Sequence, residues 1–565
     1  MALVITNYVM TLIPLKVRTA INLVSEPGTT ALVIKPIIVS IFVLAAILAL
    51  SRAFSRIMIF LPGRFIEFDL RNDLYSHLLK LSNTFYRQEK VGDLMSRLTN
   101  DIQALRLTAA LGFLHLVNTT MIYGFVIYQM TKISPQLTLY ILIPIPIVLF
   151  MVRTFVKKLY IHISENQKML GRITNFFVES LGSIRIIKSF VAEKPILDVF
   201  EDYNESFLRT NIRMAAIRAS MFPFIGIIGS IGQLILFLVG GRAIIAGTLS
   251  VGDFVAFSAY IVLIAWPTAS LSWIINIIQR GRVSLKRLNT ILETVPDIQD
   301  SKNVDRTLTM DAAPEIEFKN LSFKFDSAAE SPTLNDISFK IEAGTSVGIF
   351  GPIGSGKSTI ANLMARLETV EKGQFLVDGR DVHDWPLHAL REATAYVSQT
   401  PFLFSSLISE NIQYAERIEL DAEERSKIMT DCVVKASVLT DIERFPEGFD
   451  TLIGERGVIL SGGQKTRVAL ARALYKPHRL LILDDVLSAV DHETEKSLIH
   501  NLQTFKEPVT RVIISHRVSA LTQCEKIIVL NQGEITASGT HDELIKIPGI
   551  YQKTWAYQQL ESASE

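Results

Sequence analysis

The amino-acid sequence predicts an α-helical transmembrane domain with six spans, followed by an α/β domain built around a phosphate-binding loop. Three observations lead to this fold class. The mean hydropathy is +0.31 over 565 residues. The long runs without a charged residue lie before residue 280. The segment Gly351–Thr359 matches the phosphate-loop pattern G-x-x-x-x-G-K-[ST]. Together they indicate that one part of the chain contacts lipid and the other contacts water.

The composition excludes several classes of protein. Lys and Arg total 57 and Asp and Glu total 56, so the net charge of +1 argues against a nucleic-acid partner held by bulk positive charge. Hydrophobic residues make up 49% of the chain, which excludes an intrinsically disordered protein. The two cysteines, Cys432 and Cys524, are too few for a disulfide-built secreted fold and lack the spacing of metal ligands.

Four charge-free runs can each cross a hydrocarbon core of about 30 Å, which needs about 20 helical residues. These runs are Leu107–Met130, Ile133–Val152, Ala219–Gly241 and Phe254–Gln279. Two shorter runs, Met1–Leu15 and Pro36–Ser51, precede them. The second is expected to continue past Arg52 and Arg56, whose side chains can reach the lipid headgroups. The six runs predict six spans in a lipid bilayer. The alternative, a large buried helical core, is disfavoured by the number of long runs.

The first run is short for a span. A helix of Met1–Leu15 would be about 22 Å long at about 1.5 Å per residue. It also lacks the basic start and the cleavage site of a signal peptide. We therefore expect the first span to extend into residues before Met1, at its cytoplasmic end.

The connections between the runs indicate how the chain is oriented. Residues 62–106 carry seven Lys/Arg and residues 153–218 carry eleven, whereas the opposite connections carry five. Because positive residues favour the cytoplasmic side, both long connections are predicted to be cytoplasmic. Residues 67–106 and 158–218 also show helical periodicity with charged faces, so we expect helices that project from the bilayer and contact a cytoplasmic domain.

The change in composition near residue 290 sets the expected domain boundaries. The transmembrane domain is predicted to cover 1–285, a linker 286–313, and the α/β domain 314–565. The linker contains the polar stretch Asp297–Asp305.

The phosphate-binding loop gives the clearest chemical signal. Ser346–Phe350 predicts a short buried strand, and the glycines after it let backbone N–H groups surround phosphate oxygens. Lys357 can reach the β/γ-phosphates, and the Ser358 hydroxyl can ligate Mg²⁺. The following helix presents its positive N-terminus to the anion. The expected nucleotide contacts come from Gly351, Gly354, Ser355, Gly356, Lys357, Ser358 and Thr359.

Two further segments complete a predicted nucleotide site. The apolar run Leu480–Leu483 predicts a buried parallel strand that ends at Asp484, a candidate Mg²⁺-holding carboxylate. Leu460–Gln464 places two adjacent glycines before a helical pattern, which indicates backbone N–H groups at a helix start. One nucleotide cannot easily contact both loops of one chain, so two chains facing head to tail are expected to enclose it. The second phosphate contact comes from Ser461, Gly462, Gly463 and Gln464.

In this order, these motifs resemble an ATP-binding cassette domain, and with the preceding spans the chain resembles an ATP-binding cassette exporter half-transporter. The resemblance covers essentially residues 1–557. It implies the cofactors ATP and Mg²⁺, Gln399 as the Q-loop glutamine near the metal, His516 as the switch histidine, and Phe325 stacking on adenine. Lys357, Gln399, Asp485 and His516 are then the expected catalytic group. Gly454–Gly457 and Ser488–Asp491 match the X-loop and the D-loop.

The transmembrane half carries its own resemblance. Phe85–Asp101 is similar to the first coupling-helix region, and Glu179–Phe190 is similar to the second long loop. Ala265–Gly281 looks most like the multidrug-type halves of bacterial heterodimeric exporters. This resemblance implies a multi-pass protein of the cell membrane with a cytoplasmic nucleotide-binding domain. It also implies a second half-transporter as partner (heterodimer favoured, homodimer possible) and a hydrophobic or amphipathic substrate of the drug or lipid class.

One residue departs from the family pattern. The family usually has Glu directly after the Mg²⁺-binding aspartate, and here the residue is Asp485. Asp is one methylene shorter, and a misplacement of about 1 Å can cost on the order of 10²-fold in rate. We expect slow hydrolysis at this chain's own phosphate loop, as in the degenerate-site half of an asymmetric heterodimer. A tolerated substitution with a shifted backbone is the alternative.

Several functions fit these observations. An ATP-driven exporter half is favoured. A regulatory half with little hydrolysis of its own and a gated channel on the same scaffold are the alternatives. Polar residues inside the spans can line a substrate path, although each is more often a packing residue. These residues are Asn118, Gln129, Gln233, Trp266, Trp273 and Asn276.

Overall fold

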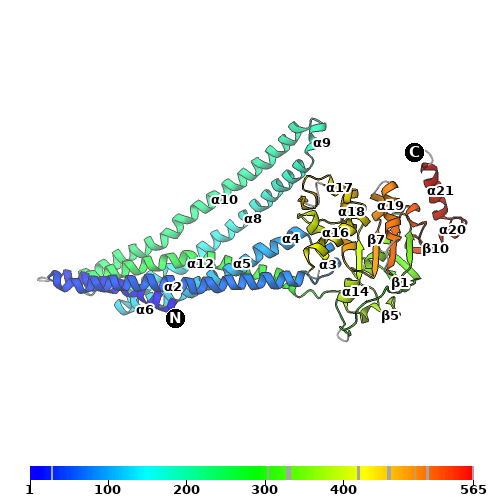
Figure 1. The fold of residues 1–565 in the computed structure, drawn as a ribbon. Coiled ribbons are helices and arrows are strands. Elements are labelled where there is room, and N and C mark those ends of the chain that lie inside the picture. Colours follow the sequence, from blue (N-terminus) through cyan, green and yellow to red (C-terminus); the bar gives the residue numbers. More distant parts are fainter. Residues whose placement is uncertain are drawn as a thin grey trace. The chain divides into compact units, whose positions relative to one another are not determined.

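The computed structural model describes residues 1–26, 30–301, 304–325, 332–416, 420–454, 460–489, 492–503 and 508–562. The chain forms two compact units (Figure 1). The helical unit comprises Met1–Leu79 and Val91–Glu293, and the α/β unit comprises Lys80–Lys90 and Thr294–Glu565.

The helical unit consists of long helices joined by short turns. Its elements are α1 (Ala2–Val24), α2 (Ala31–Leu78), α4 (Val91–Ser96), η1 (Arg97–Asp101), α5 (Ile102–Leu107), η2 (Thr108–Gly112), α6 (Phe113–Ile133), α7 (Pro135–Leu142), α8 (Pro144–Gly182), α9 (Ile184–Ser189), α10 (Glu193–Ile235), η3 (Leu236–Gly240), α11 (Gly241–Ile245) and α12 (Val251–Leu292). Several of these follow one another directly, so that 91–133 is one continuous helical stretch.

The apolar runs occupy these helices. Among the described residues, Ala31–Leu78 and Val91–Ile133 are long and apolar enough to cross a membrane by length and composition. Shorter apolar helices cover Pro135–Ile147, Gly229–Ile245 and Val251–Ala265. The first run belongs to α1, which continues well beyond Leu15 to Val24. The charge-free run Met1–Leu15 is therefore only part of a longer helix, because Lys16 and Arg18 do not interrupt it.

A buried cluster holds the helical unit together. Phe257 and Tyr260 of α12 are fully buried against Val126 and Met130 of α6. The Tyr260 hydroxyl donates to the Thr11 carbonyl of α1 at 2.9 Å. Aromatic rings of this size dominate the energetics of a core, because each buries a large apolar area.

Helix ends follow ordinary capping chemistry. Ser250 and Asp253 form a capping box at the start of α12, in which the Ser250 hydroxyl accepts from the Asp253 N–H and the Asp253 carboxylate accepts from the Ser250 N–H. Arg18 of α1 pairs with the same carboxylate at 2.5 Å. These contacts fix α1 against the start of α12.

The two long connections are helical, as their periodicity predicts. α8 and α10 run side by side in Figure 1 and pack through rings such as Phe177 and Phe200, whose centroids are 5.1 Å apart. In the other connection, Lys80–Lys90 leaves the helical unit and belongs to the α/β unit. This segment contains the short helix α3 (Asn83–Gln88).

The α/β unit contains two sheets. The larger has strand order β10-β9-β3-β8-β7-β6, and the smaller has order β2-β1-β4-β5. The strands are β1 (Ile316–Phe323), β2 (Leu334–Ile341), β3 (Ser346–Phe350), β4 (Phe375–Val377), β5 (Arg380–Asp381), β6 (Thr394–Val397), β7 (Leu480–Asp484), β8 (Thr510–Ser515), β9 (Lys526–Asn531) and β10 (Glu534–Gly539). In the larger sheet β10 is antiparallel to β9 and the other pairs are parallel.

Helices and turns connect these strands. They are α13 (Lys357–Met364), η4 (Val382–Asp384), α14 (Leu387–Ala393), α15 (Ile408–Ile412), η5 (Gln413–Ala415), α16 (Ala422–Lys435), α17 (Leu439–Glu443), η6 (Gly448–Asp450), α18 (Gly462–Tyr475), η8 (Val486–Ala489), α19 (His492–Gln503), η9 (Ser519–Leu521), α20 (His541–Leu544) and α21 (Ile550–Ser562). The central strands β3 and β7 are buried, as the predicted parallel strands require.

The expected linker differs from the structure at its start. α12 continues to Leu292, and the two units divide between Glu293 and Thr294. The beginning of the segment 286–313 is therefore helical, because Leu288 and Ile291 are buried and extend the helix.

Candidate nucleotide site

The phosphate loop, Gln399, Asp484, Asp485 and His516 gather at the carboxyl ends of neighbouring strands in the larger sheet. Strands β3, β8, β7 and β6 are neighbours and parallel. The phosphate loop follows β3, His516 follows β8, Asp485 follows β7 and Gln399 follows β6. Ligands bind at the carboxyl ends of the strands in open α/β sheets, so this edge is the candidate site.

The phosphate loop depends on its glycines. Gly354 and Gly356 have φ values of 83° and 97°, in the left-handed region that favours glycine. A Cβ on Gly351 would collide with the Leu530 carbonyl oxygen, and one on Gly356 would collide with the Leu334 side chain. The loop thus keeps its backbone close to neighbouring strands. Ser355 is buried within it, and Thr359 is buried in the first turn of α13.

Lys357 begins α13, as the pattern predicts. Its Nζ donates to the carbonyl oxygens of Gly351 (2.7 Å) and Pro352 (2.8 Å). Burial lowers the pKa of Lys357, and the negative charges of Asp485 and Asp484 oppose this shift. The ammonium group is therefore held within the curve of the loop, where phosphate oxygens would compete for it.

Ser358 and Asp484 lie side by side. The Ser358 hydroxyl donates to Asp484 Oδ1 at 3.1 Å, and the Asp484 carboxylate is buried. Burial raises the pKa of Asp484, the hydrogen bond from Ser358 opposes the shift, and the charge of Asp485 adds to it. A cation beside these oxygens would remove the cost of a buried negative charge. Hydroxyl and carboxylate oxygens are also the ligands that Mg²⁺ prefers, so the residues fit this ion.

Asp485 binds two predicted partners. Its carboxylate lies 3.0 and 3.1 Å from Nδ1 of His516, and its Oδ2 accepts from Gln399 Nε2 at 3.3 Å. The residue has a positive φ of 55°, which is uncommon for a residue with a side chain. Both carboxylate oxygens are thus engaged by protein groups.

The Leu460–Gln464 segment starts a helix, as predicted. α18 begins at Gly462, and Ser461 and Gln464 form a capping box across its first turn. Gln464 also donates to Asp441 at 2.9 Å, and Arg467 pairs with Asp441 at 2.7 Å. Ser461 and Gln464 bond to each other, Gln464 also bonds to α17, and none of these bonds involves the phosphate loop.

The sequence analysis missed two residues next to Phe325. The Arg87 guanidinium lies over the Phe325 ring, 4.7 Å from its centroid. Arg87 also forms two hydrogen bonds with Glu368, of 2.5 and 3.0 Å, and the Glu368 carboxylate is only 2% exposed. The sequence offered one indication that Arg87 is functional, namely its position inside the segment Phe85–Asp101 that is similar to the first coupling-helix region. Its partner could not be found without the fold.

Other predicted positions are only partly visible. Residues 455–457 of the X-loop and 490–491 of the D-loop lie outside the described residues. Ser488 is described, and its hydroxyl donates to the Asp485 carbonyl at 2.7 Å.

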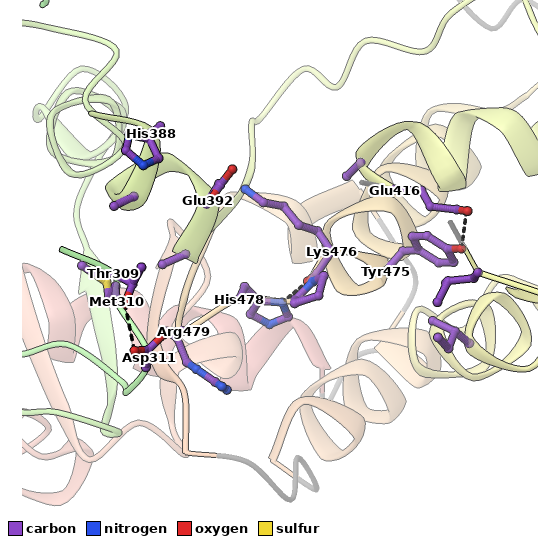
Figure 2. Close-up of a pocket in the computed structure, with 16 residues that line it drawn as sticks. Thr309, Met310, Asp311, His388, Glu392, Glu416, Tyr475, Lys476, His478 and Arg479 are labelled. Carbon is purple, nitrogen blue, oxygen red and sulfur yellow. Dashed lines mark hydrogen bonds between the residues drawn. The ribbon is translucent and has the colours of Figure 1, made fainter. Parts of the chain in front are cut away.

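A separate cavity of about 620 Å³ lies elsewhere in the α/β unit (Figure 2). It contains none of the motif residues. Its polar groups bind one another: Glu416 accepts from the Tyr475 hydroxyl at 2.7 Å, and Thr309 donates to Asp311 at 2.9 Å. The cavity is therefore not the nucleotide site.

The polar residues expected to line a substrate path have different surroundings and do not form one cluster in the described part of the chain. Gln233 donates to the Ser258 hydroxyl at 2.9 Å, and the Trp273 and His115 rings form a T-shaped pair with centroids 5.1 Å apart. Gln129 is buried, Asn276 is exposed, and the Trp266 side chain lies outside the described part of the chain. Asn118 lines a cavity in the helical unit.

Comparisons with known proteins cover both units. Residues 1–268 match the family described as "ABC transporter transmembrane region", and residues 334–488 match "ABC transporter". The chain is 35% identical over 573 residues to the multidrug resistance-like ATP-binding protein MdlA of Escherichia coli strain K12, covering 100% of this chain and 94% of that protein. It is 34% identical over 525 residues to a probable multidrug resistance ABC transporter, YheI of Bacillus subtilis strain 168, covering 93% and 88%.

A solved structure supports the fold. The structure of a bacterial Atm1-family ABC exporter with ATP bound superposes with a TM-score of 0.83 and covers 98% of this chain and 97% of that one. At 24% identity this likeness establishes the fold alone. With the sequence relatives and the ATP-binding motifs, it leads to one conclusion: the chain belongs to the ABC transporter family, as an exporter-type protein whose ATPase activity is coupled to transport.

Proposed function

We propose that this chain is one half of a dimeric exporter that moves a hydrophobic or amphipathic substrate, of the drug or lipid class, across the bacterial cell membrane. Six spans would cross the bilayer, and the α/β unit would lie in the cytoplasm. The supporting observation is the convergence of the phosphate loop, Asp484, Asp485 and His516 at the carboxyl ends of neighbouring strands. The names of two similar proteins, both of the multidrug resistance type, support the drug class.

The residues at this edge have separate roles in the proposal. The phosphate loop and Lys357 bind the β/γ-phosphates, and Phe325 provides a ring face for adenine. His516 and Gln399 orient groups around the γ-phosphate through Asp485. Closure of two such units would be transmitted to the spans through segments such as Lys80–Lys90, which is continuous with α2 and α4.

Mg²⁺ is the second cofactor of the proposal. Ser358 and Asp484 would hold it, with Gln399 nearby. When bound, the ion neutralises charge on the phosphates as it develops. The buried Asp484 carboxylate, whose pKa is raised by burial, supports a cation at this position.

Helix α18, which begins at Gly462, supports a site formed by two chains. The hydrogen bonds of Ser461 and Gln464 leave the Gly462 and Gly463 N–H groups at the open first turn of α18, ready to accept an anion. In the proposal, these groups contact the γ-phosphate on the phosphate loop of a second chain.

In the proposed dimer, each nucleotide site combines the phosphate loop of one chain with the Leu460–Gln464 segment of the other. Asp485 makes the hydrolysis rates of these two sites unequal. Its side chain is short, and its oxygens are engaged by His516 and Gln399. It is therefore poorly placed to activate water at this chain's own site. We infer a heterodimer in which hydrolysis occurs mainly on the partner's phosphate loop, completed by this chain's Ser461 and Gly463.

Steady-state ATPase assays of the purified transporter test this asymmetry. Asp485→Asn is expected to change turnover little. Ser461→Arg is expected to lower it on the order of 10²-fold, because it removes phosphate contacts from the active site. The reverse ranking, or robust activity of this chain as a homodimer, would overturn the asymmetric assignment and favour a tolerated substitution at Asp485.

Transport assays separate the remaining alternatives. In sealed vesicles, accumulation of substrate against a gradient that requires hydrolysis would exclude a gated channel. Transport that survives inactivation of this chain's phosphate loop, with ATP still bound there, would favour a regulatory role for this half.

A further inference from the structure

The helical unit contains a cavity of about 320 Å³ between α1, α2, α6 and α12. Its lining combines apolar side chains with a cluster of basic and polar ones. The polar cluster consists of Arg52 and Arg56 of α2 with His115 and Asn118 of α6. The apolar lining includes Leu3, Leu114, Ile122, Val262 and Leu263.

The cavity lies among the most apolar parts of the chain. Its α6 wall belongs to the charge-free run 107–130, and its α12 wall belongs to the charge-free run 254–279. Arg52 follows directly on the charge-free run 36–51 of α2. The two arginines therefore place positive charge beside segments of α6 and α12 that carry no charged residue. Ionisable residues among membrane-spanning segments cost free energy and usually have a function.

Neither arginine has a counter-ion among the residues that the structure describes. Arg52 and Arg56 form no ion pair with any residue in the described part of the chain, and Arg52 contacts only the Met10 sulfur at 3.5 Å through a side-chain hydrogen bond. Other arginines of the same unit are paired: Arg18 with Asp253, Arg106 with Glu67, and Arg287 with Asp101. Exposed arginines such as Arg172 and Arg280 also form no ion pair with the described residues; Arg52 and Arg56, which are exposed as well, differ from them in lining a cavity.

The backbone around the arginines is fixed. Ser55 lies between them, is only 3% exposed, and donates to the Arg52 carbonyl at 2.9 Å. One residue before Arg52, the Ser51 hydroxyl accepts from Thr6 of α1 at 3.0 Å. The bond between Thr6 and Ser51 links α2 to α1, so the two arginines start from a defined position on one face of the helix.

We propose that this cavity binds the head group of an amphipathic substrate that carries an anion, such as a carboxylate, sulfate or phosphate. The inference rests on the proposed function and deepens it by naming a substrate class. Guanidinium groups bind such oxyanions through paired, charge-assisted hydrogen bonds. The apolar lining is suited to the first carbons of the hydrophobic tail.

The size of the cavity supports a head group rather than a whole substrate. Small-molecule sites usually measure about 300–1,000 Å³ and bury most of their ligand. At about 320 Å³, this one can hold an anionic group with a short apolar segment. A longer tail would then lie along the apolar helix surfaces that flank the cavity.

Equilibrium binding to the full-length chain, purified in a neutral detergent without ATP, tests the proposal. The probes are a dansyl-labelled long-chain carboxylic acid, its uncharged methyl ester, and a trimethylammonium analogue of equal length. The acid should bind the wild type most tightly. Arg52→Ala and Arg56→Ala should each weaken its binding about tenfold or more, the loss expected for a hydrogen bond to a charged group.

Two kinds of variant control this experiment. Lys35→Ala removes an exposed positive charge from α2 outside the cavity and should leave binding of the acid unchanged. Arg52→Lys and Arg56→Lys keep the charge but lose the planar pair of donors, so they should bind the acid with intermediate affinity. ATP binding by each variant reports whether the chain is folded.

Competition identifies the source of the anion. If vesicles of phosphatidylglycerol displace the acid and vesicles of phosphatidylcholine do not, the natural occupant is an anionic lipid. If neither displaces it, the site takes a free anionic amphiphile. Equal affinity for the acid and the ester, or unchanged affinity in both alanine variants, would overturn the proposal. If the cavity proposal fails in this way but the ester is exported in an ATP-driven manner, the proposed function still stands. If the acid binds but no ATP-driven transport occurs, the proposed function fails and the anion site stands.

Discussion

In the α/β unit, Gln399, Asp485 and His516 each lie within two residues of the end of a strand, and the parallel sheet brings the three strand ends together. In the helical unit, Arg52 and His115 lie inside long helices, and only the packing of α1, α2, α6 and α12 places them around one cavity. The first arrangement is set by short backbone motifs, and the second by side chains at scattered positions. Substitutions in the motifs at the strand ends should therefore act mainly on ATP binding, whereas substitutions where helices contact each other should act on packing.

The largest effect is expected for Lys357→Ala in the α/β unit. Because this ammonium is the charged group of the phosphate loop, its removal should weaken ATP binding about 100-fold, the upper end for a charge-assisted hydrogen bond. Binding of a fluorescent ATP analogue to the purified chain measures the loss. Lys427→Ala, an exposed lysine of α16, is the matched control. Binding at wild-type affinity by the Lys357 variant would contradict the site.

Gly281→Ala should destabilise the helical unit instead. A Cβ at this position of α12 would overlap the Thr108 side chain, whose hydroxyl donates to the Ile277 carbonyl at 3.0 Å. Overpacking of this kind costs about 1–3 kcal/mol. Thermal aggregation of the detergent-purified protein should begin at a lower temperature. Gly171→Ala in α8, where no atom lies within 4 Å of the added Cβ, should be neutral. Equal effects of the two substitutions would show that helix packing does not control this unit.

Arg87→Ala should destabilise the α/β unit by about 2 kcal/mol, because it leaves the buried Glu368 carboxylate without its guanidinium. The loss is below that of a fully buried pair, since the Arg87 side chain is 41% exposed. Denaturant unfolding monitored in the α/β unit measures it. Adding Glu368→Gln to Arg87→Ala should recover part of the stability by removing the buried charge. No recovery in the double variant would argue that Arg87 acts through packing alone.

The smallest effect is a gain in stability. The pKa of Asp484 is raised in the folded protein, chiefly by burial, so its charged form costs stability above its unfolded pKa and this cost disappears as the pH falls below that value. Asp484→Asn should therefore raise the Tm of the nucleotide-free protein at neutral pH by a few degrees, at about 2–4 °C per kcal/mol. The gain should vanish in acid, and hydrolysis should fall. Thermal unfolding across pH checks the sign, and a lower Tm at neutral pH would refute it.

The sequence predicted the α/β unit in some detail because its signals are local. The order of glycines, Lys357 and Ser358 specifies a loop between a strand and a helix, and the apolar run before Asp484 specifies a buried parallel strand. The start of α18 at Gly462 followed from the two adjacent glycines. Contacts between distant segments, such as Arg87 with Glu368, carry no local signal.

The helical unit was harder to predict for the same reason. Hydropathy located the apolar runs but set helix ends poorly, as the continuation of α1 to Val24 and of α12 to Leu292 shows. Arg52 and Arg56 were expected to extend toward the headgroups. That they share a cavity with His115 depends on the rotation and depth of four helices. A periodic pattern of apolar residues predicts which face of a helix is buried. It does not predict which residues of another helix pack against that face.

The two hydrogen bonds from Lys357 to the carbonyls of its own loop have a kinetic consequence. These bonds and the positive φ of Gly354 and Gly356 define the loop backbone, so a phosphate that replaces the carbonyls as acceptors orders little additional backbone. Preorganised sites lose less conformational entropy on binding. The association rate for ATP should therefore be limited by diffusion and electrostatic attraction, and should fall as ionic strength rises, while the heat of binding reflects the difference between phosphate and carbonyl as acceptors.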